Sequence, residues 1–184
     1  MVRLAFASLY SRNQGAPIRA ILEGLVEDLN ETCNIGVLDD LSYVYLERIE
    51  CKWPLRTHLA AGSRVSAYGT SGGKTLLAAL EPEQCKRLLR SRKLEAHTPR
   101  TITKLAELEA ELAKIRARGF ALNNQEYLDG IVGLAVPIKD AAGRAVAALA
   151  MHGPVTRLSL KACEAHVPKL VQTAERIARV WITE

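Results

Sequence analysis

The chain has 184 residues, of which 48% are hydrophobic and 24% charged, and its formal net charge is +5. This length suits one domain without disulfides or metals, because such a core buries roughly 70% of the unfolded surface. No stretch approaches the ~20 apolar residues that cross a bilayer, and the first residues lack the apolar run of a secretory signal, so we expect a cytoplasmic protein with no membrane partner.

The first half of the chain predicts a helix followed by a hairpin. Isoleucines and leucines recur at helical spacing from Ile18 to Leu29, and Pro17 suits the first turn. Residues 33–38 and 42–50 are β-branched and aromatic runs on either side of Asp39-Asp40, which is typical of two antiparallel strands. Residues 54–61 are a candidate third strand.

The middle of the chain predicts a glycine-rich loop and three helices. The loop holds four glycines between residues 62 and 73 and opens onto an apolar helix at residues 75–80, after which Pro82 starts a short helix. Residues 104–118 place Leu105, Leu108 and Leu112 on one face, and Gly119 stands where a helix cap is expected. This last segment shows the clearest helical periodicity.

The last third predicts a second hairpin and a terminal helix. Residues 130–138 and 145–152 are apolar runs joined by a short polar connection, so we expect antiparallel neighbours. Apolar residues recur at helical spacing from Cys163 to Trp181, although Pro168 should delay or kink that helix. The order of elements predicts an α+β fold, with a mostly antiparallel central sheet flanked by helices and the two terminal helices side by side.

Cysteines, histidines and basic residues carry no metal or nucleic-acid signature. The four cysteines are scattered without a C-x-x-C pair, and we expect all of them to be reduced core residues: Cys33, Cys51, Cys85 and Cys163. The histidines lack two-ligand spacing, so no metal or other cofactor is expected. Residues 86–93 interleave leucines with lysine and arginine, which indicates a solvated helix face rather than a DNA-binding surface.

The segment from Gly69 to Thr75 reads Gly-Thr-Ser-Gly-Gly-Lys-Thr and superficially resembles a phosphate-binding loop. A Walker A loop needs four residues between its first glycine and the Gly-Lys pair, whereas three separate Gly69 from Gly73. A nucleotide-binding enzyme is therefore only an alternative. Unpaired N–H groups at the start of the following helix would still suit a carboxylate, unless the glycines simply make a tight turn.

Five ordered motifs together resemble the effector domains of IclR-type (isocitrate lyase regulator type) transcription regulators. Residues 69–78 resemble the T-x-x-G-K-x-L-L-A signature, and Thr101 resembles the threonine before the long helix. Residues 118–121 with Glu126, residues 130–138, and Gly153-Pro154 with Arg157 resemble further family motifs in the same order. The resemblance extends over essentially the whole chain.

The resemblance implies a GAF-like sensor domain whose partner is a small organic acid effector, without catalysis. It implies that residues 1–12 are the end of an interdomain linker helix and residues 13–184 the effector-binding domain, in a truncated chain. DNA would be bound only through an N-terminal winged helix-turn-helix absent from this chain. The resemblance also implies dimers or dimers of dimers, so we expect a homodimer or homotetramer.

The resemblance also carries over ten candidate effector-binding positions: Tyr68, Gly69, Thr70, Ser71, Gly72, Asn123, Ile131, Gly133, Ala150 and His152. Gly133 and Ala150 are smaller than usual there, so we expect a wider pocket for an aromatic or larger aliphatic acid. Its carboxylate would meet loop N–H groups and a hydroxyl of Thr70 or Ser71. His152 is either a charge-assisted donor or a strand-end side chain facing water.

An enzyme is disfavoured because the sequence has no G-x-S-x-G elbow or Cys-His signature. Glu126 and Asp129 are close enough to share a face, but such pairs more often solvate or cap a loop. A freestanding GAF-like module that binds a nucleotide or dimerises partners remains the other non-enzyme interpretation.

Overall fold

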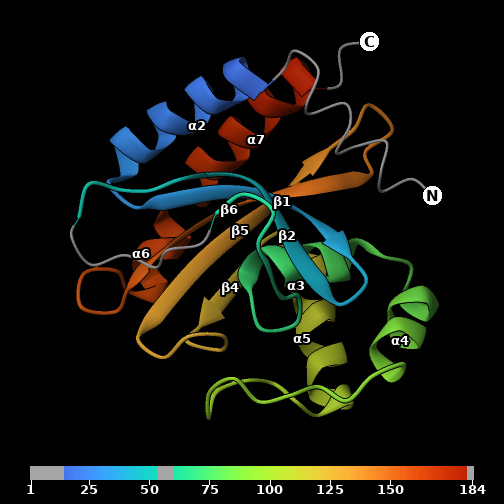
Figure 1. Ribbon diagram of the computed structural model, residues 1–184. Helices are drawn as coiled ribbons and strands as arrows, with labels where there is room; N and C mark the ends of the chain where they lie inside the picture. The colour runs from blue at the N-terminus through green and yellow to red at the C-terminus, as the bar shows by residue number, and fades with distance from the viewer. Residues whose placement is uncertain (1–14, 54–59, 182–184) are drawn as a thin grey trace.

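Six strands form one antiparallel sheet at the centre of the molecule, in the order β3-β2-β1-β6-β5-β4 (Figure 1). The computed structural model describes residues 15–53 and 60–181. The strands are β1 (Thr32–Asp39), β2 (Ser42–Ile49), β3 (Arg64–Ser66), β4 (Ala121–Asn124), β5 (Ile131–Lys139) and β6 (Ala145–Pro154). The helices are α2 (Gly15–Leu29), α3 (Ser71–Ala79), α4 (Pro82–Arg90), α5 (Leu105–Arg118), α6 (Leu160–Ala165) and α7 (Val167–Trp181).

One face of the sheet is covered by the first and last helices, which lie side by side (Figure 1). Ile18 and Leu22 of α2 and Ile177 of α7 are fully buried with the strand residues that point to this face. An ion pair between Asp28 and Lys169 also joins the two helices. The prediction that the terminal helices pack together is confirmed, as is the α+β class.

The opposite face of the sheet is covered by α3, and α5 and α4 pack against α3 further from the sheet (Figure 1). Leu77 of α3 and Leu108 and Leu112 of α5 form a second buried cluster. Gly119 ends α5 in the left-handed conformation at φ 82°, which a side chain would disfavour. The candidate site lies on this face, where α3 begins.

The structure confirms both hairpins and the helices at 15–29, 82–90 and 105–118, and it departs from the sequence prediction at four places. The glycine-rich loop is shorter than expected, because α3 already begins at Ser71. The strand Arg64–Ser66 was not anticipated, and most of the candidate strand at residues 54–61 lies outside the described residues. Strand β4 was not anticipated. The terminal helix is broken at His166, just before Pro168, into α6 and α7.

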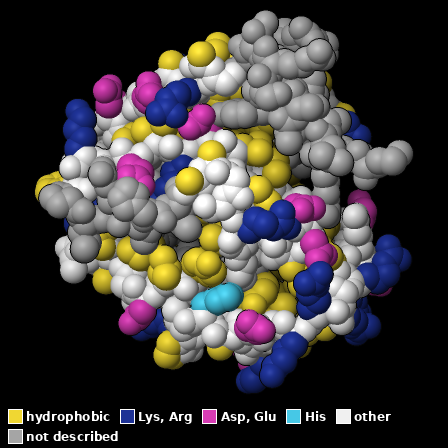
Figure 2. Space-filling view, viewed as in Figure 1, with side chains coloured by type: hydrophobic (Ala, Val, Ile, Leu, Met, Phe, Trp, Pro, Cys, Tyr) yellow, Lys and Arg dark blue, Asp and Glu magenta, His cyan; other side chains and the backbone are white. Residues whose placement is uncertain are grey.

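The structure also bears on the predictions made for the cysteines, the basic segment, membrane helices and metal ligands. All four cysteines are free and buried, as predicted. The basic side chains of residues 86–93 are mostly exposed on and after α4, with acidic groups among them, over the right-hand side of Figure 2. Within 15–53 and 60–181, no helix is long and apolar enough to cross a membrane, and no cluster of three metal-ligating side chains occurs. The predicted linker helix at residues 1–12 lies outside the described part of the chain.

Candidate ligand-binding site

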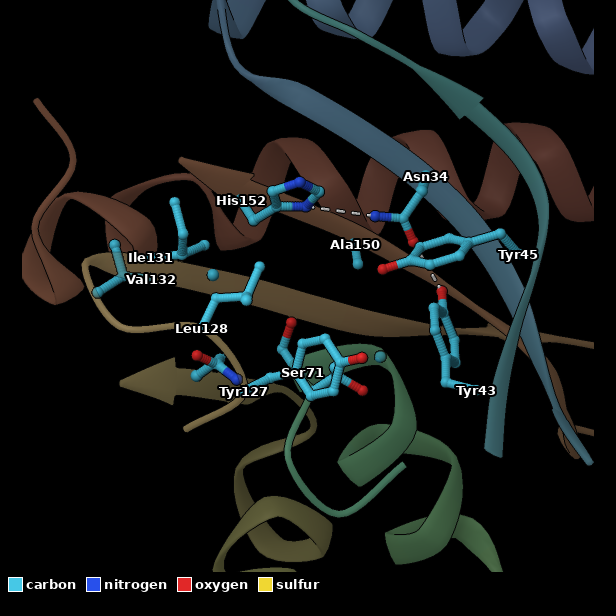
Figure 3. A pocket seen from close by; sticks show the side chains of 14 residues that line it. Asn34, Tyr43, Tyr45, Ser71, Tyr127, Leu128, Ile131, Val132, Ala150 and His152 are labelled. Carbon is cyan, nitrogen blue, oxygen red and sulfur yellow. Dashed lines mark hydrogen bonds between the residues drawn. The ribbon is translucent and has the colours of Figure 1, made fainter. Parts of the chain in front are cut away.

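A small cavity lies between the start of α3 and the face of the sheet that α3 covers (Figure 3). Its volume is about 50 Å³. The residues that line it come from β1, β2, the start of α3, β4, the loop after β4, β5 and β6: Asn34, Tyr43, Tyr45, Thr70, Ser71, Gly72, Asn123, Tyr127, Leu128, Ile131, Val132, Gly133, Ala150 and His152. None of these fourteen is a carboxylate or a lysine.

The roof of the cavity is the first turn of α3. Thr70 is the N-cap, and its hydroxyl accepts a hydrogen bond from the N–H of Gly73 at 3.3 Å and donates one to the carbonyl of Ser66 at 2.9 Å. The N–H groups of the next two residues, Ser71 and Gly72, have no partner within a helix and carry partial positive charge. The start of α3 therefore presents donors to the cavity.

Gly73 does not face the cavity and serves the packing of α3 instead. A Cβ added there would lie 2.2 Å from the carbonyl oxygen and 2.3 Å from the Cα of Ala67. Only glycine allows the helix to approach this backbone so closely. This packing role accounts for Gly73 without a phosphate ligand.

The side chain of Ser71 is buried and points into the cavity (Figure 3). Within the described residues its hydroxyl has no hydrogen-bond partner, in contrast to that of Thr70. Because this hydroxyl borders the cavity, a bound polar group can accept a hydrogen bond from it. The Ser71 hydroxyl and the first-turn N–H groups are donors of the kind that anions accept hydrogen bonds from.

The floor of the cavity is made by strand residues whose side chains alternate across the sheet. Asn34 of β1 and Ala150 and His152 of β6 face the cavity, while their neighbours Cys33 and Met151 enter the core beneath α2 and α7. This two-residue alternation follows from strand geometry. Because β1 pairs with β6, the floor combines residues that are more than a hundred positions apart in sequence.

Strand β2 contributes Tyr43, Tyr45 and Arg48 to the same side of the sheet. A register shift between Ile35 and Gly36 of β1 adds one residue to β2, so that Arg48 lies opposite Asn34. The guanidinium of Arg48 lies 5.7 Å from the centre of the Tyr45 ring. The bulge thus brings a buried cation behind the cavity wall.

A chain of polar contacts connects Arg48 to the interior. Its Nη1 lies 3.2 Å from Nε2 of His152 and, since a guanidinium has only donors, it donates to that nitrogen. Nδ1 of His152 lies 3.5 Å from the amide nitrogen of Asn34, whose oxygen accepts from the Tyr43 hydroxyl at 3.0 Å. Desolvation, and then the charge of Arg48, lower the pKa of His152 to about 3. The imidazole is therefore neutral at pH 7, and the role of His152 toward an effector stays a prediction.

The loop after β4 closes the cavity with Tyr127 and Leu128, and Glu126 anchors it. Both carboxylate oxygens of Glu126 accept hydrogen bonds from the ammonium group of Lys74 at 2.7 Å. The hydroxyl of Thr101 donates to the backbone carbonyl of Glu126 at 2.6 Å. Three motif residues that are distant in sequence therefore meet at this loop.

The same ion pair contradicts the nucleotide-binding alternative. A phosphate-loop lysine must reach the phosphates of its ligand, whereas the side chain of Lys74 is 1% exposed and bound to Glu126. Lys74 supports the loop after β4 and leaves the cavity without an ammonium group. The Gly-Lys pair thus has a structural explanation.

Eight of the ten predicted site residues line the cavity: Thr70, Ser71, Gly72, Asn123, Ile131, Gly133, Ala150 and His152. Tyr68 and Gly69 do not. The hydroxyl of Tyr68 donates to the carbonyl of Glu95 and accepts from the N–H of the same residue, in the cluster under α5. The carbonyl of Gly69 accepts from the side-chain amide of Asn123.

Six lining residues were missed by the sequence prediction: Asn34, Tyr43, Tyr45, Tyr127, Leu128 and Val132. The alternation of Tyr43 and Tyr45 in a strand was a usable signal, because two aromatic side chains two residues apart must share a face. Nothing in the sequence indicated that this face is the one that meets α3.

The expectation of a wider pocket for an aromatic or larger aliphatic acid stays a prediction. At Gly133, an added Cβ would lie 2.8 Å from the carbonyl of Met151 and 3.3 Å from Oγ of Ser71. The space that a side chain would occupy is therefore already taken by close neighbours. A cavity of about 50 Å³ holds a small polar group better than an aromatic ring.

Comparison with known proteins connects this arrangement to transcription regulators. A family model described as bacterial transcriptional regulator IclR C-terminal matches residues 7–179. The probable transcriptional regulator SauR of Cupriavidus necator is 41% identical over 179 residues, which cover 97% of this chain and 71% of SauR. The transcriptional repressor IclR of Escherichia coli is 32% identical over 153 residues, which cover 82% of this chain and 56% of that protein.

A solved structure shares the fold. The inducer-binding domain of the transcription factor PobR from Acinetobacter, a double mutant in complex with 3-hydroxybenzoic acid, aligns with a TM-score of 0.80 at 28% identity. The alignment covers 87% of this chain and 94% of that one. These relatives are regulators of transcription and not enzymes, and the chain spans only part of the length of the two curated ones.

Proposed function

Because this chain belongs to the IclR family of bacterial transcription regulators and matches the family's C-terminal domain, we propose that it senses a small organic acid. The bound acid is the effector, and its carboxylate lies at the start of α3. Regulation of DNA binding requires a separate winged helix-turn-helix domain. Such a regulator acts in the bacterial cytoplasm.

The observation that carries this proposal is the hydroxyl of Ser71, which borders the cavity beside the first N–H groups of α3 and has no hydrogen-bond partner among the described residues. A carboxylate accepts hydrogen bonds from all of these donors at once, and charge-assisted bonds are the strong ones. No lining residue is a carboxylate, while Arg48 lies one side chain behind the wall, so the cavity favours a negative ligand.

The size of the cavity supports a short acid. A space of about 50 Å³ suits a carboxylate with a chain of two to four carbons. The PobR domain is described with 3-hydroxybenzoic acid, which supports an organic acid as the class of effector. A benzoate ring in this chain requires the loop that carries Tyr127 and Leu128 to open.

Signal transfer follows from a shift in population. An acid that binds one arrangement of subunits more tightly than another favours that arrangement. Each tenfold preference supplies ~1.4 kcal/mol. We propose a homodimer or homotetramer, in which such a preference changes the spacing of paired DNA-binding domains.

Titration calorimetry with acetate, glycolate, propionate, 3-hydroxypropionate, butyrate and benzoate tests the proposal. We expect saturable binding of at least one short acid, and a rise in apparent stability of ~2.7 kcal/mol at a hundred times its Kd. Mass spectrometry should recover the acid unchanged. The absence of binding by every acid, or its consumption, contradicts the proposed function.

A further inference from the structure

We propose that Tyr45 recognises the end of the effector opposite its carboxylate and selects short acids that carry a second oxygen. This inference rests on the proposed function and concerns the same cavity. The second oxygen is a hydroxyl, a keto group or one oxygen of a second acidic group. Tyr45 is a binding residue that determines specificity.

The position of Tyr45 gives the first part of the argument. Its ring lines the cavity from β2, packs edge-on against Tyr43 at 5.4 Å, and is 6% exposed as a whole residue. Figure 3 shows its hydroxyl pointing toward Ala150, across the cavity from the side of α3 that carries Ser71. A carboxylate held at Ser71 therefore extends its other end toward Tyr45.

The second part is that the Tyr45 hydroxyl is not used by the fold. It has no hydrogen-bond partner among residues 15–53 and 60–181. The hydroxyl of Tyr43, two residues earlier, lies 3.0 Å from the Asn34 side chain and 3.2 Å from the carbonyl of Ala148. The two tyrosines lie on the same face of the same strand, but among the described residues only Tyr43 forms hydrogen bonds through its hydroxyl.

The third part is that the other polar side chains of the floor and β4 already have partners. Asn34 accepts from Tyr43, Nε2 of His152 accepts from Arg48, and Asn123 donates to the carbonyl of Gly69. The hydroxyl of Tyr127 has no partner within the described residues either, but this side chain is partly exposed, where water can reach it. Tyr45 thus offers the cavity, at the wall facing Ser71, a phenol that has no hydrogen-bond partner among the described residues.

The protonation state of Tyr45 determines which group of the ligand it can bind. Burial raises the pKa of Tyr45 to about 12, so the phenol keeps its proton at pH 7 and donates it. Arg48 over the ring adds positive potential that favours an oxygen acceptor. A methyl group at this point would leave the phenol without a partner.

The test compares matched acids in wild type and the Tyr45→Phe variant. Glycolate with propionate, and 3-hydroxypropionate with butyrate, are pairs in which a hydroxyl replaces a methyl group. By calorimetry we expect wild type to prefer the hydroxy acid of at least one pair. Tyr45→Phe should weaken the binding of that acid about three- to tenfold and change the affinity for its methyl counterpart less than about twofold.

Thermal unfolding without ligand is the control that shows whether the variant is folded. Because the phenol makes no bond to the described protein, Tyr45→Phe should melt at or slightly above the wild-type temperature. If Tyr45→Phe fails to fold, Tyr45→Met replaces it, with the same expected loss of preference for the hydroxy acid.

Each outcome separates this inference from the proposed function. If acids bind and Tyr45→Phe weakens the binding of both members of a pair equally, or of neither, the proposed role of Tyr45 is wrong. The proposal that the domain senses an acid then still holds. The same holds if wild type prefers the methyl acids. If no acid binds wild type, the proposed function fails, and this inference with it.

Discussion

The ammonium group of Lys74 lies 2.7 Å from both carboxylate oxygens of Glu126, although the two residues are 52 positions apart in sequence. Lys74 belongs to the first turns of α3 and Glu126 to the loop that closes the cavity, so this buried pair joins two walls of the site. Its removal should affect stability strongly, because either partner alone would be a buried charge.

Lys74→Met should therefore destabilise the domain by about 3–5 kcal/mol, measured by urea denaturation. Lys104→Met is the matched control, because Lys104 contacts Glu107 at 2.9 Å in an exposed pair and its loss should produce no resolvable change. Equal destabilisation by the two variants would contradict a structural role for the Lys74–Glu126 pair.

Thr70 and Ser71 are adjacent hydroxyl residues with different expected roles. Thr70→Ala removes the N-cap of α3 and should cost ~1 kcal/mol of unfolding free energy. Ser71→Ala removes a hydroxyl without a protein partner, so stability should change by less than ~0.5 kcal/mol while acid affinity falls about three- to tenfold. Denaturation and calorimetry on both variants check this division, and the reverse pattern would exclude it.

His152 should make stability depend on pH. Its pKa in the folded chain is lowered to about 3, below the ordinary value of 6.5, so acid protonates the unfolded chain first. The contribution of the neutral imidazole to the free energy of unfolding is complete above pH 6.5 and is lost as the pH falls toward 3. Between pH 7 and 5, wild type should lose ~1–2 kcal/mol more stability than His152→Gln.

The glutamine in that variant can still accept from Arg48 but does not titrate. Denaturation curves at pH 7, 6 and 5 measure the difference. Parallel pH dependence in the two proteins would mean that His152 is solvated and titrates normally.

Tyr43 should stabilise the fold through its hydroxyl, unlike Tyr45. Its side chain is 1% exposed and lies within hydrogen-bond distance of Asn34 and the Ala148 carbonyl. Tyr43→Phe should cost ~1–2 kcal/mol of unfolding free energy, because buried polar atoms lose their partner. The comparison with Tyr45→Phe, measured under the same denaturant, removes effects common to any Tyr-to-Phe change. Equal stability of the two variants would refute the assignment.

Gly73 and Gly24 should respond in opposite directions to alanine. At Gly73 the new Cβ meets the Ala67 backbone at 2.2 Å, so Gly73→Ala should destabilise by at least ~2 kcal/mol. At Gly24, within α2, nothing lies within 4 Å of the new atom, and Gly24→Ala should stabilise by ~0.5–1 kcal/mol. Thermal and denaturant unfolding measure both. A neutral Gly73→Ala would show that α3 can shift away from residue 67.

Much of the secondary structure was predictable because its signals are local. Helical spacing from Ile18 to Leu29 and the short polar connection between residues 139 and 144 each depend on neighbours within a few positions. Strand β4 was missed because Ala121–Asn124 is short and half polar. The start of α3 was placed too late because glycines suggest a loop, whereas the Thr70 cap and packing on Ala67 stabilise a helix there.

The sequence by itself determined the α+β class, the order of the elements and the family, since periodicity, turn residues and ordered motifs are all properties of a linear chain. Only the tertiary structure decided the cavity, its small volume and the partners of Lys74 and His152. These depend on which strands pair and in what register, as when Thr32 lies opposite His152. Contacts between residues so distant in sequence arise from packing, which no local pattern encodes.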